Sequence, residues 1–472
     1  MGTPSVYPMG TTIYKPEKCW NGFTLFQANE HGAMLIDMNG HVVNYWKGLQ
    51  GFPNKLLPDG SVIGSLGERN ADFGWQDQTD LVQVDWDGNV QWKFDHVEYI
   101  EDPGYEPQWM ARQHHDYEIE GNPVGYFVPG MEPNMNGKKL ILCHNTVNNP
   151  AISGHTLCDD MLIEIDKDNN IIWRWNLNEH FRELGFSEEA KNTICAHPSL
   201  TRSGGDWMHV NCASWLGPNK WFDAGDERFD PENIILDGRN TNILAIISKK
   251  TGKIVWKLGP DYTTPEARHI GQIIGQHHTH MIPRGLPGEG NILVFDNGGW
   301  AGYGAPNPGS KDGTSNALRD YSRVIEFDPT TLRIVWECRP ASLGYAQPFI
   351  ADHFYSPYIS SAQRLPNGNT LITEGSDGRL LEVTPDFEVV WEYISPYFGK
   401  MNIPTNMVYR SYRYPYEWAP QAEKPEETAI APIDNTEWRL PGAAGKAPAR
   451  TVEINGAMGY HEGEGFCVAS ED

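Results

Sequence analysis

The sequence lacks the features of a membrane or exported protein. None of its 472 residues belongs to a run of about 18 apolar residues, so no membrane-spanning helix is expected. Met1 to Pro4 show neither the basic region nor the apolar core of a signal peptide. The seven cysteines are few, odd in number and scattered, as is usual for reduced thiols. These features favour the cytoplasm; a signal removed beforehand would leave the same sequence and would indicate the periplasm.

Basic residues are also scarce. Lys plus Arg number 37 against 62 Asp plus Glu, which gives a formal net charge of −25. Nucleic acids and anionic membranes bind basic surfaces, so neither is expected as a partner. An anionic substrate would need Arg and His side chains placed locally against this charge. The sequence also has no GxxxxGK[ST] phosphate loop, no GxSxG elbow and no tandem CxxC pairs.

Turn-forming and aromatic residues are abundant. The 48 Gly and 34 Pro predict many turns, and 17 Trp with 20 Tyr favour packing on sheets. An apolar strand, a polar turn and a β-branched run ending in Trp recur six times, with the final residues Trp46, Trp92, Trp173, Trp256, Trp336 and Trp391. Each copy is typical of a β-hairpin, and a shorter hairpin pattern such as Leu365-Pro366-Asn367-Gly368 precedes most copies.

Four antiparallel strands repeated six times predict an all-β fold, the six-bladed β-propeller. Residues 1–472 then form a single propeller domain, with blades over about 20–420 and an irregular C-terminal tail over about 420–472. We expect one short helix, for which Asn178 to Ala196 is the best candidate, and a strand from one terminus that completes a blade built from the other. Two unrelated β-sandwiches are the alternative fold, which the repeated Trp disfavours.

Histidines gather in three stretches at comparable places in the repeats. The stretches are Gln113-His114-His115-Asp116, Asp206-Trp207-Met208-His209-Val210-Asn211 and Gly275-Gln276-His277-His278-Thr279-His280. Each buried imidazole nitrogen needs a partner, so three imidazoles in four residues are unusual for a core strand. The first strand of each propeller blade lines the central channel. We therefore expect the three stretches to converge on one site at the channel mouth.

Arg239 ends the apolar stretch Asn233-Ile234-Ile235-Leu236-Asp237-Gly238. Its guanidinium offers a bidentate fork that suits sulfate, phosphate or carboxylate. An ion pair with one of the many acids is the alternative role.

With these motifs the sequence resembles the arylsulfate sulfotransferase family, bacterial six-bladed propellers that move sulfate between phenols without a nucleotide sulfate donor. The resemblance covers about residues 10–420. It is carried by His-His-Asp at 114–116, Asp-Trp-x-His-x-Asn at 206–211, Arg239, and Gln276-His277 followed by Phe295-Asp296-Asn297-Gly298. The sequence departs from the family pattern at Asn240, where His is expected, and at His278 and His280, which add imidazoles.

The resemblance implies that His277 is the catalytic nucleophile and carries the sulfuryl group. His209, His115 and Arg239 are then the other catalytic groups, which bind the sulfuryl oxygens and move protons. Substrate-binding roles are expected for Asn211, His114, His278 and His280. The partner would be a small aromatic molecule, phenolic or aryl sulfate, and sulfuryl transfer would require no cofactor. A neutral imidazole can attack sulfur while cationic and amide donors stabilise the sulfuryl oxygens.

Two other functions remain open from the sequence. A metal-dependent propeller lyase or hydrolase would hold a divalent ion through His115, His209, His277 and His280. A binding or scaffold propeller without chemistry is the second alternative. The clustering of histidines disfavours this last function.

Overall fold

The computed structural model describes residues 8–69, 76–101, 106–200, 204–345, 351–399, 404–433, 452 and 455–456. The chain divides into two compact units, Met1–Ala431 and Pro432–Asp472. Most of the second unit, and with it most of the expected tail, lies outside the described residues. Among the described residues, no helix combines the length and the apolar character needed to span a membrane.

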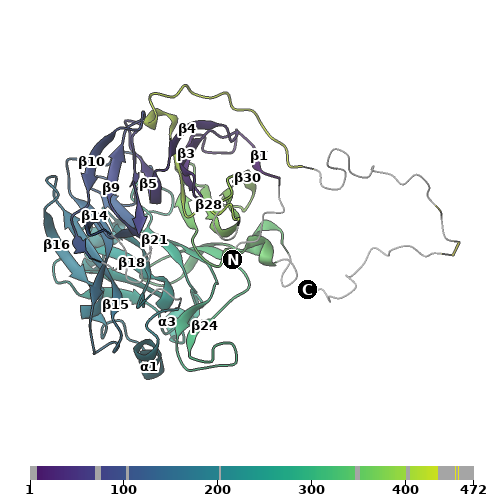
Figure 1. Ribbon diagram of the computed structural model, residues 1–472. Coiled ribbons are helices and arrows are strands. Elements are labelled where there is room, and N and C mark those ends of the chain that lie inside the picture. Colours follow the sequence, from purple (N-terminus) through teal and green to yellow (C-terminus); the bar gives the residue numbers. More distant parts are fainter. Residues whose placement is uncertain are drawn as a thin grey trace. The chain divides into compact units, whose positions relative to one another are not determined.

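The first unit is a six-bladed β-propeller, as the repeat predicted (Figure 1). Blade 1, from its inner to its outer strand, consists of β31 (Ser411–Tyr414), β2 (Phe23–Ala28), β3 (Gly32–Ile36) and β4 (Val42–Lys47). Blade 2 consists of β5 (Gln50–Leu56), β6 (Val62–Ser65), β9 (Leu81–Val84) and β10 (Val90–Phe94). Blade 3 consists of β13 (Gln113–Ile119), β14 (Lys139–Val147), β15 (Leu157–Ile165) and β16 (Ile171–Asn176). The short strand β8 (Asp77–Gln78) pairs with β13, and β7 (Glu68–Arg69) pairs with β8.

The other three blades continue around the channel. Blade 4 consists of β17 (Val210–Trp215), β18 (Ile234–Gly238), β19 (Ile243–Ile247) and β20 (Ile254–Leu258). Blade 5 consists of β21 (His277–Met281), β22 (Ile292–Asp296), β25 (Arg323–Phe327) and β26 (Ile334–Cys338). Blade 6 consists of β27 (Ser361–Arg364), β28 (Thr370–Glu374), β29 (Arg379–Val383) and β30 (Val389–Ile394). The inner strands contact one another in the cyclic order β5, β13, β17, β21, β27, β31.

The two ends of the propeller chain close the ring, as expected. The C-terminal strand β31 pairs with β2 and supplies the inner strand of blade 1. The N-terminal strand β1 (Gly10–Tyr14) pairs with β30 at the outer edge of blade 6, and Figure 1 shows purple β1 beside green β30. Closure therefore uses both ends of the chain and leaves no blade incomplete.

Shorter elements occupy the connections. Two hairpins are formed by β11 (Glu98–Ile100) with β12 (Gln108–Met110) and by β23 (Ala301–Tyr303) with β24 (Thr314–Ala317). The described helices are α1 (Glu188–Ala196), α2 (Lys220–Asp223) and α3 (Pro265–Arg268), with 3₁₀ turns η1 (Leu177–His180), η2 (Glu227–Phe229), η3 (Arg239–Thr241), η4 (Pro340–Leu343), η5 (Ala351–Phe354), η6 (Gly375–Asp377) and η7 (Tyr416–Trp418). The expectation of a single helix from Asn178 to Ala196 is corrected. The segment divides into η1 and α1, because the Ser187 side chain caps a new helix by accepting from the Ala190 amide.

The core lies between blades. Strand β19 is buried along its whole length, and its alternate residues serve different neighbours. Leu244 and Ile246 pack with Ile292 and Val294 of blade 5, whereas Ile243, Ala245 and Ile247 pack with Leu140 and Leu142 of blade 3. A strand covered on both faces reads as a continuous apolar run, which explains the Ile-Leu-Ala-Ile-Ile sequence.

Tryptophans in the fourth strands link neighbouring blades through hydrogen bonds. All six predicted Trp lie in the fourth strand of their blades, as expected. In blades 2 to 6 they pair with the penultimate residue of the third strand, but in blade 1 Asn44 takes that place and Trp46 lies two residues further on. The indole Nε1 of one Trp per blade donates to the outer turn of the following blade, at 2.7–3.0 Å, from Trp46, Trp92, Trp175, Trp256, Trp336 and Trp391. In blade 3 this role belongs to Trp175 and not to the predicted Trp173.

Candidate active site

A small cavity of about 170 Å³ lies where the inner strands of blades 3, 4 and 5 begin. Its walls are formed by Phe52, Gln76, His115, His209, Arg239, Asn240, His277, Trp300, Tyr358 and Ile359. The structure thus brings four of the predicted residues, His115, His209, Arg239 and His277, to one cavity. Each histidine comes from a different blade, as the positions in the repeat suggested.

A larger hollow of about 720 Å³ adjoins this cavity. The two share Phe52, Gln76, Tyr358 and Ile359, and the hollow adds Met407 and Tyr409 among its walls. Drug-sized ligand pockets fall within about 300–1,000 Å³. The outer hollow is therefore large enough for a small-molecule ligand, and its walls combine the aromatic Phe52, Tyr358 and Tyr409 with polar residues that include Glu30 and Glu68.

The inner strands of blades 3 to 6 begin with a kink. His115 (φ 56°), His209 (φ 53°), His278 (φ 54°) and Ser360 (φ 92°) are all in the left-handed region. Non-glycine residues take up this conformation at a cost, and such residues cluster at functional sites. Strand pairing also shifts register at the start of β13, β17 and β21. The kink turns histidine side chains out of the regular alternation of a strand.

Hydrogen bonds fix the tautomer of His277. Asn297 donates through its amide nitrogen to the carbonyls of Ser356 and Ile359, so its Oδ1 is the acceptor for His277 Nδ1–H at 2.7 Å. The Ile359 amide donates to Nε2 at 3.2 Å, which makes Nε2 the lone-pair nitrogen. Burial, reinforced by Arg239, holds the pKa of His277 well below its usual range. His277 is therefore a neutral imidazole with its lone pair on Nε2.

His209 forms a dyad with a buried carboxylate. Its Nδ1 is bonded to Asp206 Oδ2, and its side chain keeps 15% exposure toward the cavity. Burial alone would raise the pKa of Asp206, but the neighbouring His209 outweighs it, and the net pKa is lowered. Asp206 is thus ionised and holds the proton of His209 on Nδ1. This leaves Nε2 for acid–base work, as in other carboxylate–histidine pairs.

His115 packs beside His209. The two rings meet edge to face with centroids 4.7 Å apart, and Phe52 contacts the His115 ring at 5.4 Å. Burial and the nearby His209 hold the pKa of His115 well below its usual range, so its imidazole is neutral. Its Nδ1 lies 2.9 Å from His114 Nδ1, which leaves the opposite ring edge for the cavity.

Arg239 is a buried cation that lacks a direct ion pair in the described ranges, and the Asp206 carboxylate acts on its charge at longer range. The Arg239 side chain is 5% exposed and donates to Asn240 Oδ1 at 3.0 Å, and its guanidinium lies 5.3 Å from the Trp300 ring centroid. Within the described ranges it forms no ion pair with any acid. The structure therefore does not support the alternative role of Arg239, an ion pair with an acid. Burial lowers the pKa of Arg239 to about 10, so it stays charged at neutral pH. A cation without a direct ion pair in a cavity wall favours an anionic ligand.

The family of the chain can be identified from its sequence match to a known family. A family described as Arylsulfotransferase (ASST) matches residues 15–392 of the chain. The chain belongs to the arylsulfotransferase family. This confirms the resemblance found in the sequence and supports an enzyme of the sulfotransferase type.

This arylsulfotransferase family member shows distant likenesses to several solved structures. No curated protein matches it. Among solved structures, a protein of unknown function from Bacteroides caccae has 11% identity and a TM-score of 0.41, covering 83% of this chain and 98% of that chain. Dihydro-heme d1 dehydrogenase NirN has 11% identity, a TM-score of 0.38 and coverages of 89% and 78%. Streptogramin B lyase has 10% identity, a TM-score of 0.35 and coverages of 84% and 85%.

The structure does not place Asn211, His114, His278 and His280 in the described walls of the cavity. Asn211 donates to the Gln276 carbonyl at 2.8 Å and so braces the strand that carries His277. His278 meets the Ala362 amide and the Tyr412 hydroxyl, and His280 meets the Tyr126 hydroxyl at 2.9 Å. His114 stacks on His144 with ring centroids 3.5 Å apart. All four are buried, and none is among the described walls of the cavity.

The metal set expected for the lyase or hydrolase alternative is not assembled either. Among the described residues, the His, Cys, Asp and Glu ligand atoms that gather closely enough for an ion belong to His114, His144 and Asp160. None of His115, His209, His277 and His280 is in that group.

Several residues of the site had no role in the sequence-based prediction. Asp206 lies within the quoted motif three residues before His209, and this spacing was its only signal. Asn297 follows strand β22 and belongs to the quoted motif Phe295-Asp296-Asn297-Gly298, within which no role was assigned to it. Of the aromatic walls, Trp300 and Tyr358 come from loops, where the sequence carries no periodic pattern to locate them, and Phe52 comes from β5 of blade 2.

Proposed function

We propose that the protein transfers a sulfuryl group from an aryl sulfate to a phenol, with His277 Nε2 as the nucleophile. The observation that carries the proposal is the buried guanidinium of Arg239, which forms no direct ion pair with a described acid, in the same cavity as three imidazoles. The family match supports the reaction class, and the aromatic walls of the adjoining hollow support an aromatic substrate.

The donor would bind with its sulfate group in the inner cavity. Arg239 supplies positive charge to the sulfuryl oxygens, and the cavity-facing edge of His115 supplies a further polar contact. The aryl ring would lie in the outer hollow against Phe52 and Tyr358. The chain's net charge of −25 opposes an anion, so this local positive charge is what would retain it.

In the first half-reaction, the His277 Nε2 lone pair attacks sulfur and the bond from sulfur to the aryl oxygen breaks. The hydrogen bond from the Ile359 amide to Nε2 must break first, and at 3.2 Å it is long. A proton from His209 Nε2 neutralises the departing phenolate, and Asp206 stabilises the imidazolium that supplies it. Asn297 accepts from Nδ1–H of the sulfated imidazole, which carries positive charge at that stage.

In the second half-reaction a phenolic acceptor replaces the released phenol. His209 takes back one proton from the acceptor hydroxyl, whose oxygen attacks sulfur as the bond from sulfur to Nε2 breaks. His277 returns to its neutral state. Protons and bonds balance over the cycle without a nucleotide or a cofactor.

Steady-state kinetics with a chromogenic aryl sulfate and a phenolic acceptor test the proposal. Donor and acceptor should show ping-pong behaviour, because the first phenol leaves before the second binds. His277→Ala should lose both half-reactions. His280→Gln is the matched control, since His280 lies on the same strand outside the described cavity walls and should retain activity.

A sequential mechanism in which His277→Ala keeps substantial turnover would exclude the covalent route. Turnover that follows bound metal in every variant would instead favour the lyase or hydrolase alternative.

A further inference from the structure

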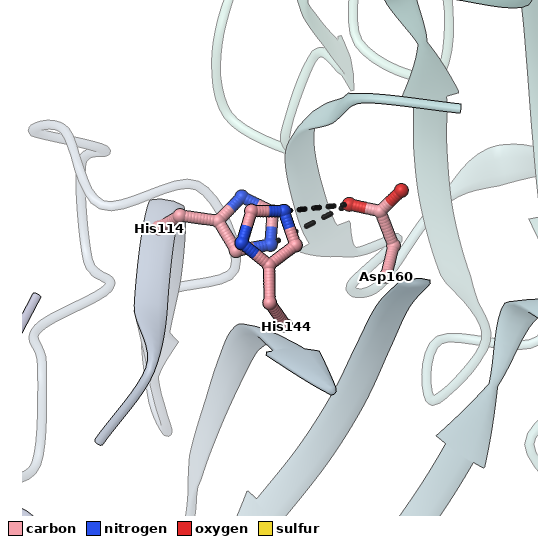
Figure 2. A group of neighbouring side chains, drawn as sticks. All are labelled: His114, His144 and Asp160. Atoms are coloured by element: carbon pink, nitrogen blue, oxygen red, sulfur yellow. Dashed lines mark ion pairs between the residues drawn. The ribbon is translucent and has the colours of Figure 1, made fainter. Parts of the chain in front are cut away.

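A second polar cluster lies in blade 3, behind His115. Figure 2 shows His114 from β13, His144 from β14 and Asp160 from β15, with both rings beside one carboxylate. His144 and Asp160 are direct partners across the two strands. All three side chains are buried, so water does not screen their interactions.

The protons in this cluster can be assigned from its neighbours. Arg112 Nε donates to Asp77 Oδ2 at 2.7 Å, so Asp77 is a carboxylate. Asp77 Oδ1 then accepts from His144 Nδ1 at 2.6 Å. The proton of a neutral His144 is therefore on Nδ1, and its Nε2 presents a lone pair.

That lone pair faces a carboxylate oxygen, Asp160 Oδ1, which also accepts from the Val210 amide at 3.2 Å. His144 Nε2 lies 3.8 Å from Asp160 Oδ1, and His114 Nε2 lies 3.4 Å from the same oxygen. Within the described part of the chain, neither Nε2 atom nor Asp160 Oδ2 has a hydrogen-bond partner. Buried polar atoms are rarely left in this state. An acceptor nitrogen held against a buried carboxylate requires a cation or an added proton between them.

We propose that His114 Nε2, His144 Nε2 and Asp160 bind one divalent first-row transition ion. Zinc–nitrogen bonds of about 2.0–2.1 Å in a tetrahedral site place ligand atoms about 3.4 Å apart, close to the separations here. Two imidazoles with one carboxylate favour ions such as Zn²⁺ or Fe²⁺ over Mg²⁺ or Ca²⁺. The Asp77 carboxylate behind His144 is the usual outer partner of a metal-bound imidazole.

The rings must move to bind this ion. They are stacked at an interplanar angle of 13°, and two parallel rings cannot both aim their in-plane lone pairs at one point. Ion binding therefore turns at least one ring out of the stack.

The ion would set the proton position of His115. A metal on His114 Nε2 confines the His114 proton to Nδ1, which then donates to His115 Nδ1 at 2.9 Å. His115 is left with its own proton on Nε2, at the ring edge that faces the cavity. The ion would thus make His115 a hydrogen-bond donor to the sulfuryl oxygens. This consequence rests on the proposed function, whereas ion binding itself does not.

Elemental analysis of protein purified without chelators or metal-affinity resin tests the site. The wild-type chain should hold one transition ion per chain. Asp160→Asn and His144→Gln should each lower the content more than tenfold. Asp159→Asn is the matched control, because Asp159 is the neighbouring buried carboxylate and bonds instead to Trp207 and Asn178.

Chelated wild-type protein provides a second readout that does not depend on a variant folding. Added Co²⁺ should give the visible absorption of a low-symmetry nitrogen and oxygen site, and Zn²⁺ should displace it and raise the midpoint of thermal unfolding. Wild-type protein that takes up none of these ions would overturn the proposal and assign the cluster a shared proton. Folded Asp160→Asn protein with a full ion content would overturn it as well. Because ion content is measured without turnover, failure here leaves the sulfotransferase proposal standing.

Discussion

Replacing Arg239 with Met should separate function from stability. The fall in the pKa of Arg239 from 12.5 to about 10 shows that folding disfavours its charged form. At about 1.4 kcal/mol for each tenfold change in the ionisation constant, this cost is roughly 3 kcal/mol. The group is charged in both the folded and the unfolded chain at any pH below about 10, so the full cost is present at neutral pH.

The substitution also removes favourable contacts. The approach to the Trp300 ring contributes about 0.5–2 kcal/mol, and the hydrogen bond to Asn240 contributes about 1 kcal/mol. The gain and the losses nearly cancel, so Arg239→Met should change the free energy of unfolding by no more than about 1–2 kcal/mol. Activity should nevertheless fall by about 10²–10³, the loss typical of removing one donor to a developing oxyanion.

Denaturant unfolding and initial rates with an aryl sulfate measure both quantities. Arg323→Met is the control, because this buried arginine pairs with Asp296 and Glu337. Breaking a buried pair costs about 3–5 kcal/mol, so the control should lose stability. If Arg239→Met lost as much stability as Arg323→Met while keeping its activity, Arg239 would be a structural cation and the assignment of its role would be wrong.

Further variants and conditions test other contacts of the site and fold. Asn297→Ala should lower kcat by about 10–100-fold, because His277 loses the acceptor that fixes its tautomer. His209→Ala should slow transfer most from donors whose phenols are weakly acidic, since those need a proton on leaving, and equal slowing for all donors would contradict the acid–base role. Burial lowers the pKa of His277 and His278 well below 6.5 and that of His280 to about 4. The unfolded chain therefore binds more protons below pH 6.5, and stability should fall by about 1.3 kcal/mol for each of these histidines between pH 7 and 5.5 in denaturant titrations. Trp175→Phe should destabilise by about 1 kcal/mol more than Trp173→Phe, because only Trp175 donates to the next blade.

The propeller was predictable because the strands of every blade repeat the same local sequence pattern. The third and fourth strands of each blade carry alternating apolar residues, a turn and a tryptophan, and this pattern depends on local spacing alone. The choice between Trp173 and Trp175 was not predictable. Both indoles point to one face of β16, and only the neighbouring turn at Gly252 selects Trp175.

The site was predictable in outline and not in detail. The three histidine stretches converge as expected, yet adjacent residues in one stretch point to different places. His277 lines the cavity, whereas His278, at the kink of the same strand, faces Tyr412. The alternation of a regular strand does not apply at such a kink.

The charge state of Arg239 was equally beyond the sequence. With 62 acidic residues in the chain, an ion pair was a reasonable expectation. Only the folded arrangement shows a guanidinium surrounded by imidazoles and an indole.

Intact-protein mass spectrometry after addition of an aryl sulfate tests the central claim most directly. A covalent sulfuryl group on His277 adds about 80 Da to the chain. The adduct should form in wild-type protein and in His280→Gln, should be absent in His277→Ala, and should disappear when a phenol is added. An active wild-type enzyme that never acquires this mass, or a His277→Ala variant that does, would contradict the account.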